Sequence, residues 1–219
     1  GDFNANPAKV HSMFFPMYVV KVSDFLEMDG PLKAHDELQQ EGLLHEWHPG
    51  MFVIFVSHQW LGQKHPDERG HQIQCLRQAL INIISGRVTV EFDVLAQSFA
   101  FMKKLQKREI QDIANGHLWL DWVSVPQRSG TADAAEWLCQ SVHIYLERSN
   151  LFCILAPRYN DPEGGEYSYA TWEQRGWCRA EMWLKQLSMR AGQLPVLLIT
   201  AAESVQYLRA PFCLYAHVH

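Results

Sequence analysis

Glu181 is the residue whose surroundings first point to chemistry. It stands in RGWCRAEMW (175–183), among bulky and soft apolar residues, and Trp177 lies one turn earlier on the same face of the predicted helix. A carboxyl group in this setting points into a cleft, where it can act on a ligand, or it stays at the surface. At the surface it interacts with the helix dipole and pairs with Lys185 four residues later. Taken alone, the residue types favour the surface position.

Three other polar segments follow predicted strands. They are SHQW (57–60), DWVSVPQ (121–127) and PRYNDPEGG (157–165). Because an open α/β sheet binds ligands beyond the carboxyl ends of its strands, these segments and the Glu181 helix predict one shared site. Besides Glu181, the candidate site residues are Ser57, His58, Trp60, Asp121, Ser124, Arg175 and Trp177.

Other chemistries have weaker support in the sequence. Cys178 is a rival nucleophile, but it occupies an ordinary helix position. His58, His65 and His71, with Asp67 between them, match no closed zinc pattern, and HPDE (65–68) is better explained as a helix start capped by Asp67. The sequence contains no G-x-G-x-x-G, P-loop or G-x-S-x-G motif. We therefore expect no metal and no bound cofactor.

Continuous apolar runs predict strands that are buried on both faces, as in parallel sheets. These runs are 51–57, 117–123, 150–156 and 194–200, with a weaker one at 212–218. Helical stripes lie between them, at 70–84, 133–149 and 173–187. Strands that alternate with helices predict a doubly wound, flavodoxin-like parallel sheet of about five strands with helices on both faces.

Two segments do not fit this alternation. Residues 1–46 form a predicted N-terminal extension packed on the core, and residues 86–116 form an insertion after the first helix. Their expected elements are a strand at 17–22, a helix near 31–42, a strand at 87–94 and a helix at 98–109. We expect one α/β domain over 47–219, and its strand-like end predicts that the protein continues further.

Charge and composition limit the classes of partner. The net charge of −5 and the pI near 6.1 argue against broad binding to nucleic acids or anionic membranes. The five cysteines lie far apart, which is typical of reduced thiols in a cytoplasmic protein. The eight tryptophans are many for this length, so several should line a core or a ligand cleft.

The order of these motifs resembles that of the fungal heterokaryon-incompatibility (HET) domain. LWLDWVSVPQ (118–127) is similar to its LWIDxxCINQ block, TWEQRGWCRAE (171–181) to its W-x-x-R-x-W-x-x-x-E block, and SHQWLG (57–62) to its S-Y-x-W-G opening. HET domains are similar in turn to Toll/interleukin-1 receptor (TIR) domains, and WCRAE (177–181) resembles the W-C-x-x-E block of the third TIR helix. The resemblance covers about residues 51–200.

The resemblance implies an enzyme that cleaves NAD+, a glycohydrolase or cyclase acting in cytoplasmic signalling, with NAD+ as substrate. The glutamate that TIR enzymes need for cleavage matches Glu181. Nicotinamide leaves as a neutral amide, so one carboxylate facing the positive charge on the ribose is sufficient. At ~4 Å and an effective dielectric of ~20 it contributes about 4 kcal/mol, or roughly a thousandfold in rate.

The types and positions of the other site residues suggest their roles. His58 and Trp60 follow a strand end and would stack on nicotinamide or adenine, unless Trp60 only anchors its loop in the core. Arg175 would hold the pyrophosphate or pair with Glu173 or Asp121, and Asp121 would orient Arg175, Ser124 or a ligand hydroxyl. Trp177 would wall the ribose pocket or pack beneath the glutamate. Neighbouring subunits complete the site in TIR enzymes, so a homo-oligomer is expected.

Two alternatives stay open. A signalling or scaffold domain without catalysis could use the same fold for homotypic contacts. An enzyme acting on another N-riboside, similar to a deoxyribosyltransferase, could use the same carboxylate. The sequence also departs from the TIR pattern, because Arg-Gly (175–176) stands where many TIR domains have Ser-x, and Val-Pro-Gln (125–127) stiffens the loop after the second predicted strand.

Overall fold

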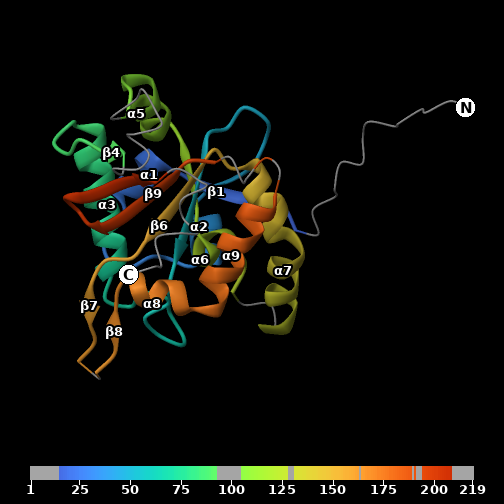
Figure 1. The fold of residues 1–219 in the computed structure, drawn as a ribbon. Helices are drawn as coiled ribbons and strands as arrows, with labels where there is room; N and C mark the ends of the chain where they lie inside the picture. Colours follow the sequence, from blue (N-terminus) through green and yellow to red (C-terminus); the bar gives the residue numbers. More distant parts are fainter. Residues whose placement is uncertain are drawn as a thin grey trace, which may run out of the picture.

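One mixed β-sheet organises the molecule. The structure, a computed structural model, describes residues 15–92, 105–127, 131–162, 164–188, 190 and 194–208. Within these residues eight strands form the sheet, in the order β2-β1-β5-β3-β6-β9-β10-β4 (Figure 1). The strands are β1 (Tyr18–Lys21), β2 (Leu44–Glu46), β3 (Val53–His58), β4 (Glu91–Phe92), β5 (His117–Trp119), β6 (Leu151–Leu155), β9 (Val196–Ala201) and β10 (Ser204–Leu208). A separate hairpin consists of β7 (Tyr159–Asn160) and β8 (Glu166–Tyr167).

The four strongest predicted strands form the centre of the sheet. Strands β5, β3, β6 and β9 are adjacent and parallel. Every residue of β3 is buried, as a continuous apolar run in a central parallel strand predicts. The expected parallel core is therefore confirmed.

The expectation of a purely parallel sheet is wrong at both edges. Strand β1 is antiparallel to β5 and to β2, so the described part of the predicted extension adds two strands to the sheet. Strand β10 is antiparallel to β9 because only residues 202–203 separate the two strands, and such a short connection makes a hairpin. The weaker run at 212–218 lies outside the described residues.

Helices cover both faces of the sheet (Figure 1). They are α1 (Val22–Glu27), α2 (His35–Gln40), α3 (His71–Ile84), α5 (Lys107–Ala114), α6 (Asp121–Ser124), α7 (Thr131–Arg148), α8 (Tyr169–Gln174) and α9 (Gly176–Leu187). Helices α1, α3 and α5 pack on one face, and α7, α8 and α9 pack on the other. None of the helices in the described part of the chain is long and apolar enough to cross a membrane.

Alternation along β3 divides its side chains between two cores. Ile54 and Val56 join the core beneath α3, whereas Val53 and Phe55 join the core beneath α7 and α9. Phe55 stacks on Trp119, with ring centroids 4.2 Å apart. Continuing the same alternation, Ser57 points to the α9 face and His58 to the α3 face, and this places two polar groups at the end of the strand.

One predicted strand ends earlier than expected, and one predicted helix is interrupted. The run 117–123 is a strand only to Trp119, because the short helix α6 begins at Asp121, whose carboxylate accepts the Trp122 N–H at 2.7 Å. The predicted helix 173–187 is broken at Arg175, whose backbone is extended (φ −71°, ψ 126°) between α8 and α9.

The insertion adds β4, which pairs with β10, and α5, which covers the α3 core through Ile113. Residues 98–104 of its predicted helix lie outside the described residues, and α5 begins only at Lys107.

Candidate functional site

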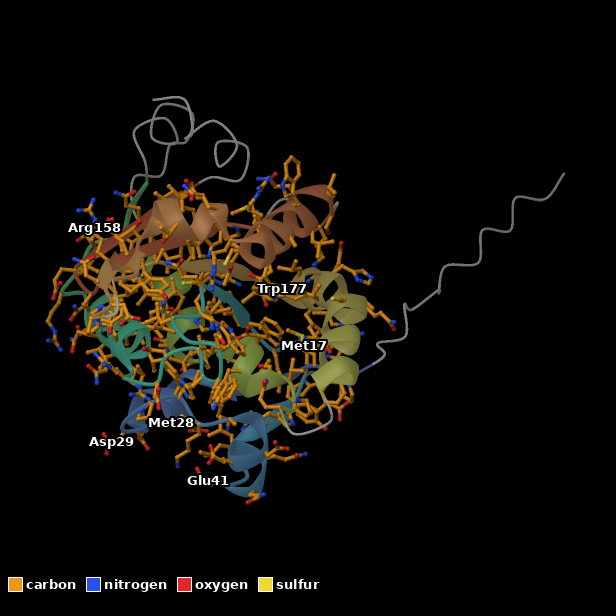
Figure 2. The ribbon with its side chains drawn as sticks, turned by 90° about the horizontal axis from the view of Figure 1, so that it is seen from below. Met17, Met28, Asp29, Glu41, Arg158 and Trp177 are labelled. Carbon is orange, nitrogen blue, oxygen red and sulfur yellow. The ribbon has the colours of Figure 1, made fainter. Side chains whose placement is uncertain are left out.

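A cavity of about 480 Å³ lies at the carboxyl ends of β3 and β5. It is lined by His58, Gln59, Trp60, Gly62, Gln63, Asp121, Arg175, Trp177 and Cys178. Five of the predicted site residues are among them: His58, Trp60, Asp121, Arg175 and Trp177. Trp177 appears near the middle of the face that Figure 2 shows, with Arg158 toward one margin. Three of the four predicted polar segments therefore converge at the sheet edge, whereas none of residues 157–165 lines this cavity.

His58 is a buried, doubly protonated imidazole. Its Nε2 lies 3.1 Å from Asp121 Oδ1, and its Nδ1 lies 3.1 Å from Gln72 Oε1. The Gln72 amide cannot be reversed, since its Nε2 donates to the Gln59 carbonyl at 2.9 Å. Both ring nitrogens of His58 thus face acceptors, and both must carry a proton.

The charges of this pair follow from its hydrogen bonds. Burial alone would lower the pKa of His58, but the hydrogen bond and charge of Asp121 raise it above the usual value. Burial alone would raise the pKa of Asp121, but His58 and the N–H groups of Trp60 and Trp122 lower it. The wall of the cavity therefore contains an internal ion pair, His58⁺–Asp121⁻.

Trp60 is held in place on both sides. Its Nε1 donates to Asp121 Oδ2 at 2.8 Å, and its carbonyl accepts a hydrogen bond from Arg175 Nη2 at 2.9 Å. Arg175 was expected to pair with Glu173 or Asp121, or to hold a phosphate. The bond to the Trp60 carbonyl uses one of its five N–H donors, which leaves the planar guanidinium able to donate toward the cavity as well.

Glu181 is buried, and only 3% of its surface is exposed. Its Oε2 lies 2.5 Å from Ser57 Oγ, which also accepts the Trp172 Nε1–H at 3.2 Å. Burial raises the pKa of Glu181 to about 8, and the charge of Asp121 adds to this, while the Ser57 hydrogen bond and the His58 charge oppose it. The carboxyl group is therefore mostly protonated at neutral pH.

Glu181 itself does not line the cavity. Trp177 and Cys178, one helical turn earlier on α9, form that part of the wall. The surface alternative is wrong, because α9 turns Glu181 toward the end of β3. The carboxyl group is thus placed one layer behind the cavity lining.

Two other predicted ligand contacts also lie away from the cavity. Ser57 is fully buried and binds Glu181, and the Ser124 Oγ accepts the Leu120 N–H at 3.3 Å. Both serines stabilise the local fold around the site. Conversely, Gln59 and Gln63 line the cavity although the prediction did not include them. Their place in SHQWLGQ, directly after β3, was the available signal.

Cys178 is unsuited to act as a nucleophile. Its thiol is buried and donates to the His58 carbonyl at 3.6 Å. Burial raises the pKa of this thiol far above the physiological range, and the negative charges of Glu181 and Asp121 raise it further. The thiolate form that a nucleophile requires is therefore scarce.

The histidines that were considered for metal binding do not converge. His65 Nε2 lies 3.0 Å from the Leu32 carbonyl, and His71 Nε2 lies 3.3 Å from the Arg158 carbonyl. Throughout the part of the chain that the structure describes, no group of three such side chains could hold a metal ion. The predicted cap is confirmed, because the Asp67 carboxylate accepts the N–H groups of His71 and Ile73, at 2.8 and 2.9 Å.

A second, smaller cavity adjoins the first. It measures about 200 Å³ and is lined by Leu61, Gly62, His65, Glu68, Arg69, Tyr159 and Asp161. Gly62 lines both cavities.

Comparison with protein-family models, with curated proteins and with solved structures gives no match for this chain. Any assignment of function therefore depends on the residues of the site and on the order of its motifs.

Proposed function

We propose that this protein is an NAD+ nucleosidase that cleaves the bond between nicotinamide and ribose, with Glu181 as the essential carboxylate. Two observations support the choice of fold family. The parallel strands stand in the order second, first, third, fourth, which is the flavodoxin-like and TIR-like order. The W-C-x-x-E block (177–181) begins the helix that borders the cavity, the position that the resemblance implies.

The shape and chemistry of the cavities support a dinucleotide ligand. A volume of about 480 Å³ fits one half of such a ligand. Trp60 and Trp177 offer flat apolar surfaces for a nicotinamide ring, and Arg175 offers donors for the pyrophosphate. The adjoining cavity at Gly62 leaves room for part of the second half, beside Tyr159 and Arg69.

The reaction needs little from the protein besides a placed negative charge. The bond between ribose C1′ and the pyridinium nitrogen breaks, and the bonding electron pair leaves with neutral nicotinamide. Water then adds to C1′ and releases a proton, or a base nitrogen of the same ligand adds and closes a ring. From one layer behind the cavity lining, the Glu181 carboxylate stabilises the positive charge on the ribose through space, and Ser57 orients the carboxylate.

Binding of the cationic nicotinamide ring of the substrate beside Glu181 would itself favour ionisation of the carboxyl group. The pKa of Glu181 is near 8, so a positive charge at the cavity wall displaces its proton within the physiological range. A carboxyl group that is neutral when the cavity is empty and charged when the pyridinium enters suits this reaction.

The observation that carries the proposal is the buried Glu181 carboxyl group, one helical turn behind a tryptophan-walled cavity at the strand ends. Nicotinamide release from NAD+ by concentrated protein tests it, with Glu181→Gln beside the wild type. Release by wild type and none by the variant supports the proposal. Equal release by both would reject the role of Glu181, and no release by either, even when the protein is tethered into oligomers, would reject the activity.

One observation favours a second candidate, a signalling or scaffold domain that acts through homotypic contacts. Trp183 and Leu187, one turn apart on α9, are 50% and 77% exposed, and neither lines the cavity. Exposed apolar side chains of this size often mark protein contacts. If Trp183→Lys abolishes self-association while no form of the protein cleaves NAD+, the scaffold function is favoured. If it abolishes both, the enzyme is one that assembly activates.

A further inference from the structure

A third cavity, at the opposite end of the parallel strands, is rich in basic side chains. It has a volume of about 480 Å³ and lies where β3 and β5 begin. Its lining consists of Lys21, His45, His48, Gly50, Met51, Phe52, Asp112, Asn115 and His117. Neither the cleavage of NAD+ nor the fold requires so many basic groups at this place.

The sheet brings these groups together from separate parts of the chain. Lys21 at the end of β1 pairs in register with His117 at the start of β5, and His45 comes from β2 on the far side of β1. The rings of His45 and His117 meet edge to face, with centroids 6.1 Å apart. His48 joins them from the loop between β2 and β3.

Their charges are not balanced within the described residues. Lys21 and the three histidines make no ion pair there, and Asp112 on α5 is the one carboxylate in the lining. Burial lowers the pKa of His117 most, and repulsion from His45 lowers it further. The Phe52 carbonyl opposes this, while Lys21 and His48 add weaker lowering effects. His117 thus resists protonation, because it is buried and basic side chains surround it.

We propose that this cavity binds a small dianion, of the phosphate ester or sulfate class, through Lys21, His45, His48 and His117. A dianion placed among these groups removes their mutual repulsion and favours the imidazolium forms, each of which donates two N–H bonds. By linkage, binding takes up protons and is tighter at low pH, with Asp112 as the one facing group of opposite sign.

Sulfate is the suitable probe because it stays a dianion across the range in which histidine titrates. Its dissociation constant is measured at constant ionic strength from the histidine ring resonances of the purified protein. Uptake of one proton tightens binding by up to about tenfold per pH unit, so we expect affinity near pH 6 to exceed affinity near pH 8 by about tenfold or more. The same titration should raise the pKa of the His45 and His117 rings.

Two variants test the site against one matched control. Lys21→Met and His45→Gln should each weaken sulfate binding about fivefold or more, by loss of a charge near the anion. His143→Gln changes an exposed histidine on α7, outside the lining, and should leave binding unchanged. The ring resonances of the remaining histidines show in the same spectra that each variant is folded.

Three results would overturn the proposal. The first is no saturable binding near pH 6, and the second is equal affinity at both pH values. The third is that zinc alone saturates the same histidines while sulfate does not, which would make this a metal site. None of these results depends on whether the protein cleaves NAD+.

Discussion

Glu181→Gln should stabilise the protein at neutral pH, because the wild-type carboxyl group is held in its protonated form. Its pKa rises from 4.5 in the unfolded chain to about 8 in the folded one. A raised carboxyl pKa contributes stability that is complete below pH 4.5 and is lost as the pH rises toward 8. Glutamine keeps the shape and a partner for Ser57 but has no proton to lose.

The magnitude follows from the two pKa values. At neutral pH the unfolded chain releases this proton and the folded protein keeps it, which costs the wild type about 3 kcal/mol relative to acid conditions. Between about pH 5 and pH 8 the free energy of unfolding of the wild type should therefore fall by about 3 kcal/mol relative to that of Glu181→Gln. The titration of His58 and Asp121 also changes the free energy of unfolding with pH. It does so in both proteins, so most of its effect cancels in the difference between the wild type and Glu181→Gln.

Urea denaturation at several pH values measures this difference, with Glu166→Gln on the exposed residue of β8 as a control. The control should follow the wild type at every pH. Parallel curves for the wild type and Glu181→Gln would refute the reasoning, since they would mean that Glu181 titrates alike in the folded and unfolded states. The same variant is expected to lack NAD+ cleavage, so a gain in stability with a loss of activity would mark a residue kept for function.

Three further results are expected. Asp121→Asn should lower the free energy of unfolding by about 3–5 kcal/mol, because it leaves the buried His58 charge without its partner, and urea denaturation measures the loss. Phe55→Ala should cost about 3–5 kcal/mol by opening a hole between Trp119 and the α9 core, and a loss below about 1 kcal/mol would contradict the packing described. The initial rate of nicotinamide release at low NAD+ concentration should rise with pH up to about 8 and then become constant, because Glu181 ionises over this range in the ligand-free protein. A rate that falls over this range would exclude Glu181 as the group that must be ionised.

The central strands could be predicted because a strand that is buried on both faces appears in the sequence as a continuous run of apolar residues. The six residues Val53–His58 include a continuous apolar run, and the strand lies at the centre of the sheet. Toward the edges, strands were expected at 17–22 and 87–94, where β1 and β4 lie, but their partners and directions could not be predicted. The direction of β10 depends on the length of its turn from β9, and the pairing of β1 with β5 depends on contacts between distant segments.

The part of the site that follows directly after the strands could be predicted from the sequence. His58, Trp60 and Asp121 follow β3 and β5, and the strand order brings them together. The depth of Glu181 was not predictable, because it depends on how α9 rotates against Ser57 and Trp172. The break at Arg175 separates α9 from α8, and it could not be predicted because the apolar pattern of the sequence continues through it.

The end of β3 separates two pairs of titratable or hydrogen-bonded side chains, one on each face of the sheet. Ser57 and its acid partner Glu181 lie on one side, and the next residue, His58, lies on the other with Asp121 and Trp60. The positive charge of His58 favours ionisation of Glu181, and a charged Glu181 in turn favours the imidazolium of His58. A ligand that ionises Glu181 on one side of the strand would therefore favour the charged His58–Asp121 pair on the other side, where Asp121 also accepts the Trp60 Nε1–H.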